Sequence, residues 1–245
     1  MTWIDVVFWA SLALIPLFLG FDAVYRARRF DTPRFWRLRA AAVTLLAIAL
    51  SFAVPMLWAR LFGDWTLLNL SVLGTAGGAV VGILVYELGH YWYHRTIHRN
   101  DTLWRLFHQM HHSPESLDAW GAYYLAPTDV IMFVTLQTLI IGPLLGVNMG
   151  AAMIANLFLT FNALFQHANI RTPVWLGYLI QRPESHGIHH ERGVHAYNYS
   201  DLPLWDIVFG TFRNPERFEG EVGFWNGASA KVGDMLLAKD VSRAA

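Results

Sequence analysis

Long apolar runs separated by short polar segments make up most of the chain up to about residue 165. Three of these runs extend over about Trp3–Gly20, Ala40–Ala59 and Ser71–His94. A longer apolar stretch, about Val130–Phe165, is interrupted near Gly142, and we interpret it as two helices that form a hairpin. Runs of about 20 apolar residues are long enough to cross a bilayer as helices. The pattern predicts an all-α integral membrane protein with about five membrane-crossing helices, an N-terminal span followed by two hairpins.

The composition supports this interpretation. Hydrophobic residues make up 55% of the 245 residues and charged residues only 15%, whereas about 25% of the residues of soluble domains are charged. The first apolar run lacks a basic leader and a small-residue cleavage site, so we expect a true transmembrane helix rather than a cleaved signal. The formal net charge is zero, which gives no indication of a nucleic-acid partner.

The segment Tyr25–Arg39, between the first two spans, contains six arginines. The positive-inside rule places it in the cytoplasm and the N-terminus outside. A patch for nucleic acid or anionic lipid is the alternative, but the position between two spans favours a role in topology. Each later hairpin returns the chain to the same side. We therefore expect the polar segments that follow the third and fifth spans to face the cytoplasm. The hydrophobic composition and the short tail suggest a bacterial inner membrane, and a protein of the endoplasmic reticulum would look similar.

No repeat or composition shift divides the chain, so we expect residues 1–245 to form a single membrane domain. Residues 1–86 would be the N-terminal transmembrane helices, and residues 87–212 would form the functional region. Residues 213–245 would be a cytoplasmic C-terminal tail, with one short helix near Asp234–Lys239.

Eight of the 11 histidines fall into three clusters. The first is a pair four residues apart, and the other two share the spacing HxxHH; their members are His94, His98, His108, His111, His112, His186, His189 and His190. Residues four apart lie on the same face of a helix, so a pair can direct two imidazoles to one point. In HxxHH the last two residues differ by about 100° around the helix, so one motif can serve two neighbouring ions. Eight imidazoles are too many for one ion, and we interpret the clusters as a dinuclear metal site in a cytoplasmic helical cap.

The available side-chain ligands limit which metal ions the site can bind. The chain contains no cysteine, which excludes thiolate ligands, iron–sulfur clusters and disulfides. Structural zinc sites close with four ligands that usually include cysteine, so an all-histidine site of this size is not typical of them. Imidazole suits iron, copper, zinc and nickel. Two redox-active ions at the mouth of a membrane bundle suit the activation of O2 against an unactivated C–H bond, and we expect two Fe ions, which zinc can replace in overexpressed preparations.

The order of the three clusters between transmembrane hairpins resembles the fatty acid hydroxylase superfamily, also called the sterol desaturase family. The resemblance covers roughly Glu87–Phe212 and includes Tyr91-Trp-Tyr-His-Arg95, Leu103-Trp104, Phe165-Gln-His167 and Trp205-Asp-Ile-Val-Phe-Gly-Thr211. It implies membrane-bound, O2-dependent di-iron enzymes that hydroxylate or desaturate lipids, and occasionally cleave ether lipids, with a site that faces the cytoplasm. It also implies that the eight clustered histidines are the catalytic metal ligands.

Five further residues near the clusters deserve an interpretation. The resemblance implies that His167, at the end of the second hairpin, is a ninth ligand; a hydrogen-bonded interfacial histidine is the alternative. For His90 and His195 we expect a supporting or structural role. Asp206 would orient a ligand imidazole or, more commonly, cap the local backbone. Glu87 would lie near the metals or, more simply, form a hydrogen bond between helices in the membrane.

The most specific hypothesis is a membrane monooxygenase or desaturase acting on a lipid, which would be a sterol, fatty acyl, sphingoid, ether lipid or aminolipid. No haem, flavin or nucleotide motif is evident, so electrons would come from a separate cytochrome or ferredoxin with its reductase. Two other classes of protein stay open. A transition-metal carrier would place its histidines near the bilayer midplane, and a non-redox metal-dependent lipid hydrolase would need no oxygen.

Overall fold

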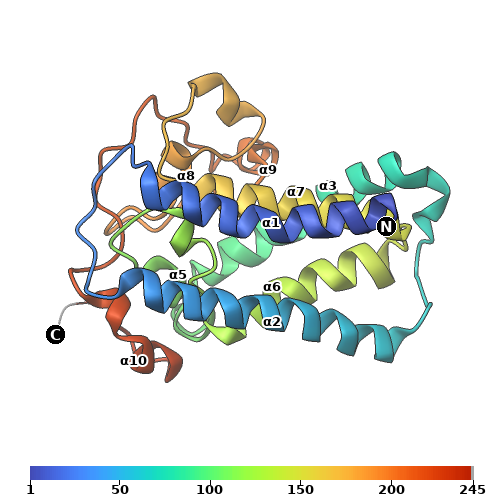
Figure 1. Cartoon of the computed structure of the whole chain (residues 1–245), viewed down its shortest axis with the longest axis horizontal. Coiled ribbons are helices and arrows are strands. Elements are labelled where there is room, and N and C mark those ends of the chain that lie inside the picture. Colours follow the sequence, from blue (N-terminus) through green and yellow to red (C-terminus); the bar gives the residue numbers. More distant parts are fainter. Residues whose placement is uncertain (244–245) are drawn as a thin grey trace.

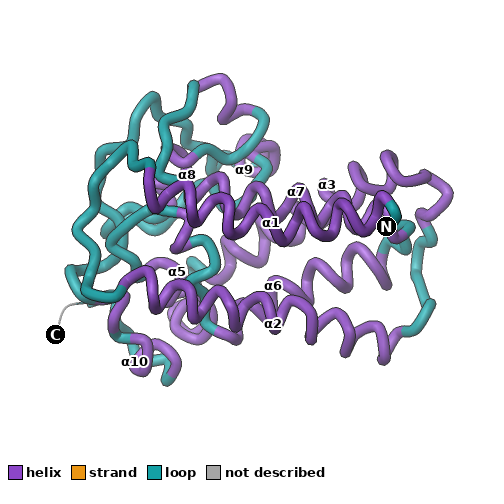
Figure 2. The backbone as a smooth tube through the Cα atoms, viewed as in Figure 1, coloured by secondary structure: helices purple, strands orange, loops and turns teal. Residues whose placement is uncertain are grey.

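A computed structural model of the chain describes residues 1–243. Five long helices dominate it: α1 (Trp3–Val24), α2 (Trp36–Phe62), α3 (Gly74–Ile97), α6 (Pro127–Leu139) and α7 (Met149–His167). The described residues contain no β-strand (Figure 2). With the short helical segments that adjoin α3 and α6, all five helices are long and apolar enough to cross a membrane. The predicted all-α fold with five crossing helices is confirmed.

The helices run up and down, so that the polar segments gather at one end of the bundle (Figure 1). The arginine-rich segment after α1, the segment between α3 and α6, and everything after α7 lie at this end, which we call the polar end (residues 25–35, 98–126 and 168–243). The α2–α3 and α6–α7 connections lie at the opposite end (Figure 1). The arginines and all three histidine clusters therefore share one end, as the count of crossings predicts. Which side of the membrane this end faces stays a prediction.

Small residues allow α3 and α7 to approach closely. A Cβ atom added to Gly78 of α3 would lie 2.9 Å from the Cβ atom of Ala151 in α7, so any larger residue at position 78 would push the helices apart. Small residues at such crossings are typical of membrane helices, which associate through packing rather than through the hydrophobic effect. This close packing matters because α3 and α7 each carry histidines to the polar end.

Short helices fill the polar end. They are α4 (Asp101–Leu103), α5 (Gln109–His112), α8 (Pro183–His189), α9 (Pro203–Val208) and α10 (Val232–Leu236). A π-helical turn, Trp104–His108, joins α4 to α5. The predicted helix near Asp234–Lys239 forms slightly earlier, as α10.

The C-terminal segment packs onto the rest of the polar end. The buried carboxylate of Glu115 accepts hydrogen bonds from the backbone N–H of Gly227 and Ser229, at 2.9 and 3.1 Å. The buried side chain of Gln109 bonds the backbone of Lys239 and Val241. Residues 213–243 are thus part of the helical cap and cover α5, which carries two of the clustered histidines.

Candidate metal centre

Nine histidines meet at the polar end, where α3 and α7 leave the bundle. Their ring nitrogens form two groups, and within each group the nitrogens lie within 4.8 Å of one another. The five-histidine group consists of His94, His98, His108, His112 and His189. The four-histidine group consists of His111, His167, His186 and His190. The structure thus brings together all eight clustered histidines and adds His167 to them.

Each HxxHH motif divides its histidines between the two groups. His108 and His112 belong to the five-histidine group, while His111 between them belongs to the other. In the second motif the assignment is reversed, because His186 and His190 belong to the four-histidine group and His189 does not. Residues i and i+4 share a helix face and residue i+3 points about 60° away from residue i. The spacing alone therefore builds two adjacent sites from two short helices.

Three backbone carbonyls orient most of the five-histidine group. The carbonyl oxygens of His195, Tyr197 and Tyr199 accept hydrogen bonds from Nδ1 of His98, His189 and His94, each at 2.7 Å. The acceptors are alternate residues of a single segment between α8 and α9. A carbonyl can only accept, so Nδ1 of each ring carries the hydrogen and Nε2 presents a lone pair. We call residues 195–199 the orienting segment.

Two other contacts fix further rings in the same way. Nδ1 of His108 lies 2.7 Å from Oδ2 of the wholly buried Asp129, at the start of α6. Nδ1 of His167 donates to the carbonyl of Ala163, at 2.7 Å, within α7. Hydrogen bonds of this kind fix the tautomer of metal-binding histidines and increase their basicity.

The Nε2 atoms face one another at distances that fit a shared cation. Nε2 of His94 lies 2.8 Å from that of His108 and 3.1 Å from that of His98. Because backbone carbonyls accept the Nδ1 hydrogens of His94 and His98, neither Nε2 atom has a proton to donate across their 3.1 Å separation. Imidazole nitrogens lie about 2.1 Å from a bound zinc ion, so two of them at right angles are about 3.0 Å apart. The donor set therefore fits a bound metal ion.

The four-histidine group shows the same approach. Nε2 of His167 lies 3.2 Å from that of His111 and 3.1 Å from that of His186, which in turn lies 3.0 Å from that of His190. In the other group, Nε2 of His112 and of His189 are buried and have no hydrogen-bond partner among the described residues. Buried polar atoms without partners are costly. One metal ion in each histidine group would satisfy these nitrogens.

The histidines outside the membrane-spanning helices are held neutral. Burial lowers the pKa of His98 to about 3. Burial, with repulsion from neighbouring imidazoles, also lowers the pKa of His112 and His189 well below the usual value. Neutral imidazoles offer lone pairs without first losing a proton, which favours metal binding at physiological pH.

Two histidines lie beside the groups without belonging to either. The ring of His90 stacks on His94, with centroids 5.3 Å apart and planes 8° apart. Nδ1 of His195 lies 3.1 Å from Nδ1 of His112. Both positions fit the supporting roles expected for these residues.

Two acids hold the orienting segment instead of contacting the two groups. Asp206 accepts hydrogen bonds from the backbone N–H of Tyr199 and Ser200, at 2.8 and 2.9 Å, and so caps the local backbone. Glu87, inside the membrane on α3, accepts from Oγ of Ser200 at 2.7 Å and from the backbone N–H of Asp201 at 2.9 Å. Its bond joins α3 to a loop, not to another helix. Both acids fix the place of the Tyr199 carbonyl and therefore of His94.

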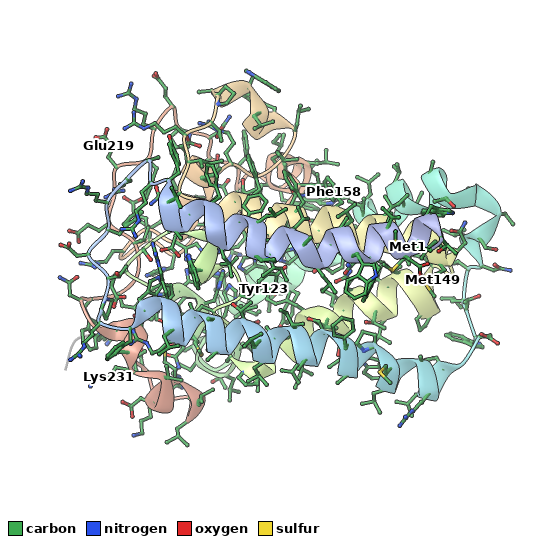
Figure 3. All side chains as sticks on the ribbon, viewed as in Figure 1. Met1, Tyr123, Met149, Phe158, Glu219 and Lys231 are labelled. Atoms are coloured by element: carbon green, nitrogen blue, oxygen red, sulfur yellow. The ribbon has the colours of Figure 1, made fainter. Side chains whose placement is uncertain are left out.

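A cavity of about 740 Å³ leads from the histidines into the membrane-spanning bundle. Its walls come from α1, α2, α3, α6 and α7. Tyr123 also lines it and lies between α1 and α2 in the view of Figure 3. The histidines that reach the cavity are His90, His94, His108, His111, His167 and His186. The remaining wall is mostly apolar, and its polar side chains include the amides of Gln137 and Asn156, which lie 3.4 Å apart. The cavity has the size of an ordinary small-molecule site and a mostly apolar lining.

Comparison with known proteins gives relatives that act on lipids. The chain is 27% identical to an ornithine lipid hydroxylase of Rhizobium tropici over 88% of this chain and 68% of that protein. It is 24% identical to a sphingolipid C4-hydroxylase of Saccharomyces cerevisiae over 83% of this chain and 55% of that protein. It is 31% identical to an alkylglycerol monooxygenase of Danio rerio over 54% of this chain and 30% of that protein.

The chain therefore spans about two thirds of the first of these relatives and much less of the third. The comparison with solved structures gave no significant match. The profile of the fatty acid hydroxylase family matches residues 79–211, more than half of the chain and a range that includes all nine histidines of the two groups. On this match, the chain belongs to the fatty acid hydroxylase family.

Proposed function

We propose that this protein is an integral membrane oxidoreductase that uses two irons and O2 to hydroxylate a lipid. The observation that carries the proposal is the position of two adjacent imidazole groups at the end of a mostly apolar cavity inside the membrane-spanning bundle. The three relatives described above are named as hydroxylases or monooxygenases, which favours hydroxylation over desaturation.

The nine histidines would hold the metals, one ion in each group. Iron bound there would supply the O2 activation that attack on an unactivated C–H bond requires. The chain's own contribution is orientation. The orienting segment and Asp129 hold the Nδ1 hydrogens of four rings, so that these rings present Nε2 lone pairs without rearrangement.

The cavity would bind the alkyl chain of the lipid. A bilayer is already apolar, so moving a chain from the bilayer into the cavity gains little from the hydrophobic effect. Affinity must instead come from close packing and from polar contacts near the metals. Side chains such as Phe133, which packs edge-on against His90 and His94, would hold the reacting carbon beside the metal centre and exclude water.

The distribution of charge supports a cytoplasmic metal centre. Of the 18 lysines and arginines in the sequence, Arg60 alone lies at the end of the bundle opposite the polar end. The positive-inside rule then favours a cytoplasmic polar end, in a bacterial inner membrane. Electrons would come from a cytoplasmic carrier, a cytochrome or a ferredoxin, with its reductase.

Isotope labelling would test the proposal. The iron-loaded, full-length protein is incubated with bacterial lipid extract, a chemical reductant and 18O2, and the lipids are analysed by mass spectrometry. We expect one labelled oxygen atom in a lipid product, and no product from a variant in which His189 is replaced by alanine. Product formed without O2 would favour the hydrolase, and a metal-uptake defect without any lipid change in cells that lack the protein would favour the carrier.

A further inference from the structure

The metal centre has two faces, and only one of them reaches the cavity. Four of the nine histidines do not line the cavity: His98, His112, His189 and His190. On this second side, the rings of Trp104 and His195 lie against the five-histidine group and are themselves partly exposed at the polar end. The substrate would occupy one face, so a partner in the aqueous phase must approach the other.

His195 connects the surface to two rings of the five-histidine group. Its Nδ1 lies 3.1 Å from Nδ1 of His112. Its backbone carbonyl accepts the Nδ1–H of His98 at 2.7 Å. The side chain is thus one hydrogen bond from one ring of the group, and its backbone is one hydrogen bond from another.

Trp104 adds a second contact at the same place. Its ring centroid lies 5.0 Å from those of both His98 and His112, and 5.7 Å from that of His195. Aromatic rings at these separations are in van der Waals contact. The partly exposed indole of Trp104 therefore contacts two histidines that do not line the cavity.

The backbone at His195 is strained. Its φ angle is 41°, a left-handed conformation that is unfavourable for a residue other than glycine. Such strain persists where the surroundings impose it, and it clusters at functional sites. Here the hydrogen bonds to His98 and His112 hold the strained residue in place.

The exposed surface of the polar end carries more positive than negative charge although the chain is neutral. Seven acids are buried among the described residues, namely Asp22, Glu87, Glu115, Asp129, Glu184, Asp201 and Asp206, but Arg182 is the one buried residue among the arginines and lysines. The exposed surface is consequently richer in positive charge than the sequence suggests. Arg99 and Arg105 flank Trp104 in sequence and are exposed or partly exposed. Arg192 is less available to a partner, because it pairs with Glu221 at 2.6 Å.

We propose that Trp104, His195, Arg99 and Arg105 form a docking surface for an acidic one-electron carrier protein, and that electrons pass through Trp104 and His195 to the five-histidine group. The inference rests on the proposed function, because it supplies the reductant for that reaction. Each hydroxylation breaks a C–H bond, forms a C–O bond and releases the second oxygen atom as water. O2 thus takes two electrons from the C–H bond and two from the carrier, in two single transfers, with two protons from solvent.

Docking and electron transfer can be measured separately. The full-length protein is placed in nanodiscs of zwitterionic lipid, so that lipid charge does not contribute. Binding of an acidic plant-type [2Fe–2S] ferredoxin or a soluble cytochrome b5 domain to the zinc-loaded, redox-inert protein is measured at several salt concentrations. We expect the double variant Arg99→Glu/Arg105→Glu to weaken binding of at least one carrier more than tenfold at low salt, and Arg217→Glu, an exposed change elsewhere at the polar end, to leave it unchanged.

Stopped-flow oxidation of the pre-reduced carrier by the iron-loaded protein then tests the route. At saturating carrier, where a loss of affinity does not limit the rate, we expect Trp104→Leu to slow electron transfer more than tenfold, with unchanged metal content. Trp104→Phe keeps an aromatic ring and should retain most of the rate, which controls for a loss of packing. Reduction by dithionite, which needs no docking surface, should proceed equally in all variants.

Several outcomes would overturn the inference while leaving the proposed function intact. One is a parent protein that hydroxylates lipid with dithionite but binds neither acidic carrier. Another is a charge-reversal effect that appears only in nanodiscs of anionic lipid, which would assign the arginines to lipid headgroups. A third is an equal rate of carrier oxidation in the parent and in Trp104→Leu. Failure of the parent to hydroxylate with any reductant would instead contradict the proposed function.

Discussion

Asp129 and His108 form a buried pair in which the carboxylate oxygen lies 2.7 Å from the ring nitrogen that faces away from the five-histidine group. The pair joins the start of α6 to the π-helical turn before α5. It thereby ties the position of one ring of the group to a membrane-spanning helix that carries none of the nine histidines.

Replacing Asp129 with leucine should weaken metal binding at the five-histidine group. Loss of such a partner typically costs about 10–100-fold in metal affinity, because the ring is no longer held in one tautomer and orientation. Competition with a chelator of known affinity measures the effect. Asp31→Leu, an exposed change at the same end, is the control, and equal affinities in the two variants would contradict the assigned role.

The two histidine groups should lose metal independently. His189→Ala removes a ring from the five-histidine group and His186→Ala one from the other. Mass spectrometry of protein loaded with iron under anaerobic conditions should give two ions per chain in the parent and about one in each variant. His90→Ala, which removes a ring outside both groups, should retain two. A fall to zero in either single variant would instead indicate one shared site.

Replacing Glu87 with alanine should destabilise the protein more than a typical surface change. The buried carboxylate accepts hydrogen bonds from Oγ of Ser200 and the backbone N–H of Asp201, and its removal leaves buried donors without partners. Each unsatisfied group costs about 1–3 kcal/mol. Thermal unfolding of the metal-free protein in detergent should therefore show a clearly lower midpoint, whereas Ser200→Ala, which removes one donor, should lower it less. Equal midpoints for the two variants would contradict the stabilising role assigned to Glu87.

Bulky substitutions at different positions along the cavity should show how far the alkyl chain extends into it. Ala152 and Ala163 both line it from α7, and they lie about 22 and 6 Å along the helix from His167. Ala163→Phe should block all lipid substrates, while Ala152→Phe should block only those with long chains, and metal content should stay at that of the parent. The chain lengths of the hydroxylated products, read by mass spectrometry, test this. Identical product profiles would mean that the alkyl chain does not follow the cavity.

The sequence predicts the spans and the meeting of the histidine clusters well, because both depend on simple periodicity. A run such as Ala40–Ala59 needs only length and hydropathy to be recognised, and HxxHH needs only the angle between helical positions. His167 has no such spacing partner, and the resemblance to a family was required to single it out.

The contacts that orient the rings are harder to foresee. Asp129 stands in the first turn of a helix, where an acid is ordinarily explained by the helix dipole. The carbonyls of His195, Tyr197 and Tyr199 give no signal, since every residue has one. The cavity is equally hidden, because residues such as Leu12 and Ile48 that line it have the same character as residues that face lipid.

The orienting segment also determines when, during synthesis of the chain, the five-histidine group can form. The ribosome releases the chain from its N-terminus, so His94 to His112 are made long before residues 195–199 and before the second HxxHH motif. Until those residues follow, the five-histidine group lacks His189 and the carbonyls that fix His94 and His98. Synthesis of the five helices therefore precedes completion of the two histidine groups, and metal ions would enter a nearly finished membrane protein rather than a growing chain.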